Sequence, residues 1–475
     1  MAATPGSGKT TESRTGAMSS QPSQQKGLLP PASPAYVLRG HAAPIHALNF
    51  FAHNEHLLSG DADGWVVIWS LVTKRPIAVW KAHEGAILEA KGFYYEESRE
   101  MEIFTHGRDH KLRVWKTNPR DGKLLDRTLP VDLKQGSQPE TGLKPWLLHS
   151  LAVNALNFCA FALCSLPGYL EHNPAIVLSS AETASFQENT QQTSPQRNPQ
   201  GPLLIAVPNA LNSGNIDIFH LPSEHRVSTI AGDTTKETGM VMAVNLYFAL
   251  NQDLYVISAY EDGQAMVHVR RGPAEPGDYD GHVPSTPWKW QKIYASRAHS
   301  QPILSLDVSP SKDFFLTSGA DPLVIKHPIP TEIPTHLSKS DMVPIKVVND
   351  HHAGKQGLKI RSDGKLYATA GWDARVRVYT CKSMKEMACL KWHKEGCFVV
   401  AWANIYSDAS NFTSQADPMT LTKVPEPQPS SYNVIPEPSN RSLLAIRTQR
   451  LQKAQLTHWL AAGSKDGKIS LWDIY

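Results

Sequence analysis

The chain has 475 residues, of which 41% are hydrophobic and 19% are charged, a composition typical of a globular protein with a sizeable core. Its 47 Lys and Arg against 44 Asp and Glu leave a net charge of +3, too small to indicate a nucleic-acid-binding groove. The five cysteines are odd in number and lack Cys-x-x-Cys spacing, which favours reduced intracellular thiols over a disulfide framework or a zinc site.

Residues 1–34 are predicted to form a disordered, low-complexity tail, because they are polar and rich in Pro, Ser and Gln. They show no cleavable signal peptide, so the protein is not expected to be secreted. Pro5–Thr10 looks like the end of a phosphate-binding loop. The first glycine of that motif would fall on Ala3, however, and no strand precedes it, so we expect no nucleotide site.

A repeated unit begins after the tail. Its cleanest copy is Ser59–Trp69, in which a small residue, an acid and a turn glycine lead to an apolar run ending in an aromatic residue. Further copies, some with His or Tyr at the end and one with Ser213 in place of the acid, are Thr105–Trp115, Asn209–Phe219, Ser258–His268, Thr317–His327, Thr369–Tyr379 and Ala462–Trp472. The spacing is typical of a β-hairpin with an Asp-Gly turn.

Most hairpins follow a histidine and a further apolar strand, so each unit reads as four antiparallel strands. Seven such units predict an all-β, seven-bladed β-propeller over residues 35–475. Ile469–Trp472 lacks a fourth strand and Tyr36–Arg39 has no blade before it. We therefore expect the N-terminal strand to complete the last blade and close the ring, which removes open sheet edges.

The chain is longer than a seven-bladed ring requires, and the surplus residues are predicted to lie in insertions. These are expected at about 117–144, between blades two and three, and within later blades at 166–202, 272–287, 328–344 and 405–457. Leu151–Leu170 carries no formal charge, but Asn and Pro interrupt it, which favours a buried strand plus a loop over a membrane helix. Pro425–Pro429 cannot join a sheet.

Arg441–Leu456 is predicted to form an imperfect basic amphipathic helix, since leucines alternate with Arg and Lys. The interpretation we favour is a helix lying on its own propeller. A helix presented to a partner and a plain loop are the alternatives.

The repeat resembles the WD-repeat family, whose signature dipeptides match Gly40-His41 and Trp472-Asp473. In that family a His, a Ser or Thr, an Asp and a Trp form a buried hydrogen-bond relay within a blade. The resemblance implies a relay of His41, Ser59, Asp63 and Trp69 in blade one, of His83, Thr105, Asp109 and Trp115 in blade two, and of His393, Asp466 and Trp472 in blade seven. Blades three to six depart from the pattern, so their relays are expected to be incomplete.

The recurring His, Ser and Asp could also suggest a hydrolase triad. A triad needs one exposed nucleophile beside an oriented base, whereas a relay repeated in successive blades is better explained as buried scaffolding. We therefore expect a non-enzyme with no cofactor, no metal and no small-molecule substrate, whose function lies on its surfaces.

In WD-repeat proteins partners dock on the narrower face, near the start of each inner strand. Carried over by position, the resemblance implies a partner-binding rim of His46, Glu89, Asn154, Met242, Leu304 and Phe398. Apolar residues around a channel are typical of the anchor patches that protein partners use.

The segments Pro34–His41, Leu58–Gly64, Trp80–His83, His106–Asp109 and Ala462–Gly467 narrow the resemblance to the fungal ASTRA-associated WD-repeat family. This implies a scaffold subunit of a nuclear assembly that contains a Tra-type pseudokinase, AAA+ helicases and the Tel2–Tti co-chaperones. Such an assembly regulates chromatin and matures phosphatidylinositol-3-kinase-related kinases. No direct nucleic-acid or membrane partner is expected, and the location implied is the nucleus, with the cytoplasm also possible.

Two other classes stay open. A G-protein β-like signalling subunit would need a long N-terminal coiled-coil helix, which the prolines of residues 1–34 oppose. A substrate adaptor or histone-peptide reader would need an acidic, aromatic-lined channel mouth, and only Glu89 among the rim residues is acidic.

Overall fold

The computed structural model describes residues 33–118, 121–134, 142–154, 159–167, 201–232, 238–272, 287–332, 343–406 and 440–474. The predicted N-terminal tail lies outside these residues except for its last two positions. Most of the predicted insertions at 166–202 and 272–287, and the proline stretch Pro425–Pro429, also lie outside them.

The described chain folds into seven sheets of four antiparallel strands each. From the inner to the outer strand, blade one contains β2 (Ile45–Phe51), β3 (His56–Asp61), β4 (Trp65–Ser70) and β5 (Arg75–Lys81); blade two contains β6 (Ile87–Tyr95), β7 (Glu100–Gly107), β8 (Lys111–Thr117) and β9 (Trp146–Ala152); blade three contains β10 (Ala162–Ser165), β11 (Leu203–Pro208), β12 (Ile216–Leu221) and β13 (His225–Ile230).

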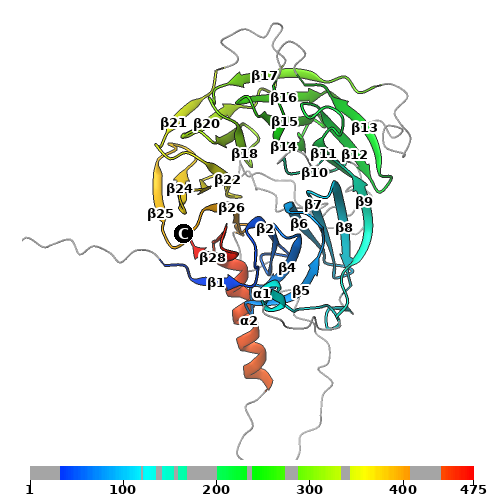
Figure 1. Ribbon diagram of the computed structural model, residues 1–475, viewed down its shortest axis with the longest axis vertical. Helices are drawn as coiled ribbons and strands as arrows, with labels where there is room; N and C mark the ends of the chain where they lie inside the picture. Colours follow the sequence, from blue (N-terminus) through cyan, green and yellow to red (C-terminus); the bar gives the residue numbers. More distant parts are fainter. Residues whose placement is uncertain are drawn as a thin grey trace, which may run out of the picture. The chain divides into compact units, whose positions relative to one another are not determined.

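The remaining blades follow the same order. Blade four contains β14 (Val241–Phe248), β15 (Leu254–Tyr260), β16 (Gln264–Arg270) and β17 (Gln291–Arg297); blade five contains β18 (Ile303–Val308), β19 (Phe314–Gly319), β20 (Leu323–Pro328) and β21 (Lys346–Asn349); blade six contains β22 (Lys355–Ile360), β23 (Leu366–Gly371), β24 (Val376–Thr380) and β25 (Glu386–Leu390); blade seven contains β26 (Cys397–Trp402), β27 (Trp459–Ser464), β28 (Lys468–Asp473) and β1 (Tyr36–Arg39). The predicted seven-bladed β-propeller is confirmed (Figure 1).

The ring closes as predicted, because β1 is the outer strand of blade seven. Tyr36 pairs with Leu471 and Arg39 with Lys468 in an antiparallel register. The first strand of the ring thus covers the edge of β28 that would otherwise present unpaired backbone groups.

The core lies between neighbouring blades. Successive side chains of a strand point to opposite faces of the sheet, and each face packs against a different neighbour. On β3, for example, Leu57 packs in the cluster shared by blades seven and one, whereas Leu58 packs in the cluster shared by blades one and two. The seven clusters each join one pair of neighbouring blades, and together they make the ring one continuous body.

All five insertions join strands at the same face of the propeller. In an antiparallel blade the first-to-second and third-to-fourth connections lie at one face, and the remaining connections lie at the other. The insertions follow β8, β10, β16, β20 and β26, which are first or third strands of their blades. We call this face the insertion face. The opposite face carries the start of every inner strand and is called the rim face.

The first insertion was predicted between blades two and three, and this placement is wrong. It connects β8 to β9 within blade two, because β9 pairs with β8. Its described part runs along the outer edge of blade one, where Val79 donates its N–H to the Asp126 carbonyl at 2.8 Å. It then reaches the rim face with α1 (Pro130–Lys134), where Val131 donates its N–H to the Gly40 carbonyl at 2.9 Å.

The uncharged segment Leu151–Leu170 contains the end of β9 and the inner strand β10, with residues 155–158 and 168–170 outside the described part. The membrane-helix alternative also finds no support elsewhere. Among the described residues no helix has the length and apolar character needed to cross a membrane.

The predicted helix is present as α2 (Asn440–Leu456), but most of its described part does not lie on the propeller. Residues 445–450 are exposed, and Figure 1 shows α2 extending away from the blades. Only the last turn is attached, through buried Ala454 and through Gln455, whose carbonyl accepts a hydrogen bond from Asn54 at 3.0 Å. Its apolar residues do not gather on one face, so the prediction of an amphipathic helix is wrong.

Candidate partner-binding face

The relay of blade one contains a different aspartate from the one predicted. His41 bonds through Nδ1 to Asp61 at 2.7 Å and through Nε2 to the Ser59 hydroxyl at 2.7 Å. Trp69 donates its indole N–H to the same hydroxyl at 2.8 Å. Asp63 lies outside this network with 46% of its side chain exposed, and it pairs with Lys134 of α1 at 3.0 Å.

The turn that follows β3 explains why Asp61, and not Asp63, bonds to His41. Asp61 is the last residue of β3, and its second carboxylate oxygen accepts the backbone N–H groups of Asp63 and Trp65, each at 3.0 Å. Asp61 therefore closes the turn and orients the histidine at once, while Asp63 points to solvent. Gly64 in this turn has a φ of +86°, a conformation that L side chains rarely adopt.

Blade two brings together the four residues predicted for it. His83 bonds to Asp109 at 2.7 Å and to Thr105 at 2.8 Å, and Trp115 donates to the Thr105 hydroxyl at 2.9 Å. Arg113 adds a bond to the Asp109 carboxylate at 2.7 Å. The His83 and Arg113 side chains lower the pKa of Asp109 although its partial burial opposes the shift, so the carboxylate stays ionised.

Blade seven contains a shortened relay. Ala462 stands where the other relays have a hydroxyl on the second strand, so the hydroxyl comes instead from Ser470 on β28. His393 bonds to Ser470 at 2.8 Å, and Trp472 donates to Ser470 at 2.8 Å. Asp466 makes no hydrogen bond to His393 and pairs with Lys468 at 2.6 Å, so its predicted place in the relay is wrong.

Blade five has a complete relay, contrary to the expectation for blades three to six. His299 bonds to Asp321 and to Thr317, each at 2.8 Å. His327 replaces the tryptophan, since it bonds to Thr317 at 2.9 Å and to the Tyr294 hydroxyl at 2.9 Å. The sequence already carried the signal, because His327 ends the repeat at the spacing of the tryptophan.

Blade six contains a different buried polar group. Asp350 accepts a hydrogen bond from the Tyr379 hydroxyl at 2.7 Å and pairs with Lys355 at 2.8 Å, with the lysine almost fully buried. The ammonium offsets the cost of burying the carboxylate. The relay side chains of blades one and five are buried, as are those of blade two except the partly buried Asp109, so the geometry indicates a scaffold role.

The relay of blade five predicts a measurable pH dependence. Burial lowers the pKa of His327 to about 3, so it is neutral when folded but protonates near pH 6.5 when unfolded. Its contribution to stability is present above pH 6.5 and is lost as the pH falls toward 3. Between pH 7.5 and 5.5 this residue alone should lower the free energy of unfolding by about 1.4 kcal/mol.

Urea unfolding at the two pH values checks this. His327→Phe should reduce the pH-dependent loss by about that amount, whatever its effect on absolute stability, while His351→Gln, which changes an exposed histidine, should leave the loss unchanged. Equal pH dependence in the parent and His327→Phe would contradict a buried neutral imidazole.

The rim face is shaped by β-bulges. Six of the inner strands skip one residue in their pairing with the second strand, immediately after their first residue. A bulge turns the unpaired side chain out of the regular alternation. The bulged residues are His46, Leu88, Met242, Leu304, Gln356 and Phe398.

Two predicted rim residues from neighbouring blades lie together. The His46 ring of blade one stacks on the Phe398 ring of blade seven, with centroids 5.4 Å apart and planes within 14°. Both side chains are half-buried, as is Leu304 of blade five. Burial lowers the pKa of His46, so the stacked imidazole is neutral at physiological pH and presents an apolar surface.

Glu89 is not a rim residue in the sense predicted, because the bulge in β6 falls on Leu88. Glu89 instead lies near charged residues of other inner strands. Burial lowers the pKa of Lys91, with Glu89 opposing the shift, and the pKa of Lys359 is raised chiefly by Asp307 and further by Glu89. These four residues form a charge-balanced group along the inner strands.

Two other predicted rim residues are buried. Asn154 precedes the inner strand of blade three, and its amide donates to the Asn209 carbonyl at 2.7 Å, which ties blade three internally. Met242 is at a bulge but only 7% exposed. Neither offers a surface to a partner.

Blade six contributes rim residues that the sequence reasoning missed. Trp372 follows β23 at the rim face and is 50% exposed, and its indole N–H donates to Gln356 at 2.9 Å. Gly354 allows this placement, because a Cβ there would lie 2.3 Å from the Trp372 ring. The exposed aromatic residue directly before Asp373 in the turn was the available signal. We define the rim patch as His46, Leu88, Leu304, Gln356, Trp372 and Phe398.

Comparison with known proteins shows which family the sequence matches. The sequence model of a family described as ASTRA-associated protein 1 matches residues 34–472. The chain is 51% identical over 451 residues to ASTRA-associated protein 1 of Aspergillus flavus, covering 94% of this chain and 99% of the relative. Identity to the Aspergillus niger protein of that name is 52% over 449 residues (94% and 98% covered), and to the Schizosaccharomyces pombe protein 28% over 409 residues (80% and 97% covered).

Proposed function

Because the chain belongs to the ASTRA-associated protein 1 family, we propose that it is a non-catalytic scaffold subunit of the ASTRA assembly that docks through the rim patch. The observation that carries this is the set of half-buried aromatic and apolar side chains at the bulged starts of the inner strands, on the rim face. Such side chains are the usual anchors of protein partners.

The chemistry of the rim patch favours a protein partner. Trp372, Phe398 and neutral His46 offer flat rings, and the side chains of Leu88 and Leu304 add apolar contact. Aromatic side chains bury large areas at low entropy cost, and hot spots are enriched in them. The six side chains of the rim patch carry no formal charge with His46 neutral, which supports apolar docking over capture of a cationic peptide at this face.

The partners proposed are those of the assembly: a Tra-type pseudokinase, AAA+ helicases and the Tel2–Tti co-chaperones. On this proposal the protein works in the nucleus, in chromatin regulation and in maturation of phosphatidylinositol-3-kinase-related kinases. The rigid ring would hold the rim patch in a fixed geometry, since seven interblade cores restrain it.

Affinity purification of the tagged full-length chain, with mass spectrometry of the recovered proteins, tests this proposal. We expect the pseudokinase, the helicases and the co-chaperones to be enriched over an untagged control. Recovery of a ubiquitin ligase or a G-protein γ chain, with none of these proteins, would support the adaptor or signalling class instead.

A further inference from the structure

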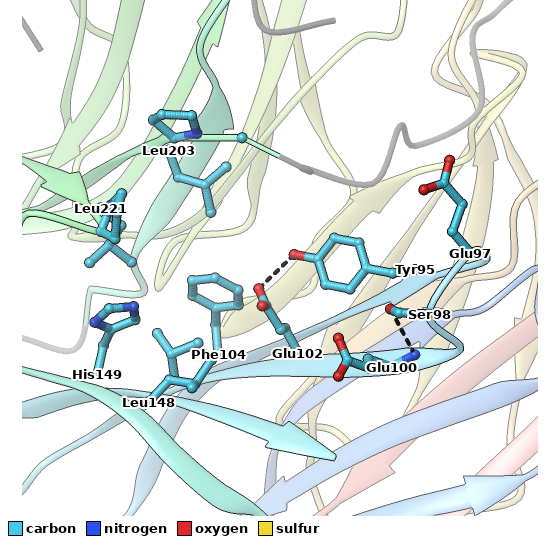
Figure 2. A pocket seen from close by; sticks show the side chains of 14 residues that line it. Tyr95, Glu97, Ser98, Glu100, Glu102, Phe104, Leu148, His149, Leu203 and Leu221 are labelled. Carbon is cyan, nitrogen blue, oxygen red and sulfur yellow. Dashed lines mark hydrogen bonds between the residues drawn. The ribbon is translucent and has the colours of Figure 1, made fainter. Parts of the chain in front are cut away.

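A cleft of about 600 Å³ lies at the insertion face between blades two and three. Figure 2 shows Tyr95, Glu97 and Glu100 on one side of it, and Leu203 and Leu221 of blade three on the other. Its remaining lining residues include Phe104, Leu148, His149, Pro202 and Pro222. The cleft is therefore lined by apolar side chains and by the polar residues of the β6–β7 hairpin.

The charged groups of the cleft are acidic. Glu97, Glu100 and Glu102 line it, whereas no lysine or arginine occurs among its described lining residues. Glu102 accepts the Tyr95 hydroxyl at 2.6 Å, and Glu100 pairs with Lys116 at 2.7 Å, outside the lining. The Lys116 bond lowers the pKa of Glu100, which stays ionised.

Glu97 is the carboxylate most available to a ligand. It is exposed, and within the described ranges it has no hydrogen-bond or ion-pair partner. The two other carboxylates lie close by along the same hairpin, since Glu100 and Glu102 are on β7. A cation entering the cleft would therefore meet a concentrated negative charge.

The strand beside the cleft is an apolar edge. β9 is the outer strand of blade two, and among the described strands it pairs only with β8. Its first three residues are exposed and apolar: Trp146 is 76% exposed, Leu147 43% and Leu148 38%. Leu148 also lines the cleft, because the bulge between β8 and β9 falls on it. An exposed apolar edge strand is a template for pairing with an extended segment.

We propose that β9 and the adjoining cleft bind an extended, basic segment of a protein partner, which adds to blade two as a fifth strand. The backbone of the segment pairs with the free edge of β9, and its apolar side chains cover Trp146 and Leu147. Its lysine or arginine side chains enter the cleft, where the aliphatic stems pack on Leu148 and the cationic groups reach Glu97 and Glu100. This site is on the opposite face from the rim patch.

Selection of random decapeptides displayed on phage against the immobilised full-length chain tests the proposal without choosing a ligand beforehand. The enriched peptides should combine Lys or Arg with apolar residues. One enriched peptide, synthesised with a fluorescent label, then serves as the probe for anisotropy. No enrichment, or enrichment of acidic or uncharged peptides, would overturn the proposal.

Substitutions in the cleft and on β9 show whether the probe binds at this site. The double variant Glu97→Gln with Glu100→Gln should bind the probe with roughly tenfold lower affinity, the loss expected for two exposed ion pairs. Added salt should lower the affinity of the parent for the probe to a similar extent. Trp146→Ser should also lower the affinity for the probe at least fivefold. Ile345→Ser, just before the edge strand of blade five and 55% exposed in the parent, is the matched control and should bind unchanged.

Two further results separate this site from others. The rim variant Leu304→Asp with Phe398→Asp should bind the probe like the parent. The test of the peptide site is therefore independent of the test of docking through the rim patch. Unchanged binding by the double glutamine variant would overturn the proposal. A dimer of the chain that Trp146→Ser dissolves would overturn it as well, since β9 would then pair with a second copy.

Discussion

Replacing Asp61 by alanine is expected to lower the free energy of unfolding by about 3–5 kcal/mol, because its carboxylate accepts three hydrogen bonds, and buried bonds to a charged acceptor contribute about 1.5–3 kcal/mol each. The carboxylate and the His41 ring are fully buried and 2.7 Å apart. The substitution also leaves the partly buried N–H groups of Asp63 and Trp65 without their acceptor.

Asp63→Ala is the matched control, two residues away in the same turn. It removes a half-exposed pair with Lys134, and exposed pairs contribute about 0–1 kcal/mol. Urea unfolding followed by tryptophan fluorescence measures both variants. Equal destabilisation by the two substitutions would show that Asp61 is not the acid of the relay.

The rim variant Leu304→Asp with Phe398→Asp is expected to reduce recovery of assembly subunits by at least tenfold. Each substitution removes an apolar anchor and places a charge in a contact that excludes water, and anchors of this kind contribute about 2 kcal/mol or more. Met242 is left unchanged because it is only 7% exposed, and an aspartate there would unfold blade four.

Leu250→Asp provides the control for this variant. Leu250 is fully exposed in the turn between β14 and β15, on the insertion face, so the same chemical change is made on the other side of the ring. Its recovery of subunits should equal that of the parent. Melting curves of both variants verify that the ring is intact. Loss of recovery in Leu250→Asp alone would move docking to the insertion face.

The fold could be predicted because its determinants are local and repeated. The spacing from turn acid to terminal aromatic residue specifies a hairpin, and its recurrence specifies blades. Closure was predictable too, since β28 and β1 each lacked one neighbour in sequence.

The sites were less predictable, for physical reasons. Asp61 and Asp63 both flank the same turn, and only the direction of the side chain decides which one reaches His41. Leu88 and Glu89 are neighbours at the start of β6, and only the pairing of β6 with β7 shows that Leu88 is the bulged residue. α2 carries both apolar and basic residues, yet its residues 445–450 are exposed, which composition alone does not reveal.

Hydrogen exchange can show whether the rim patch is the docking surface. Amide exchange is measured for the full-length chain alone and within the purified assembly. We expect slower exchange in the assembly at the starts of the inner strands, around residues 44–47, 302–305 and 396–399. Unchanged exchange there, with slowing confined to insertion-face turns such as 96–99 and 249–252, would contradict docking through the rim patch.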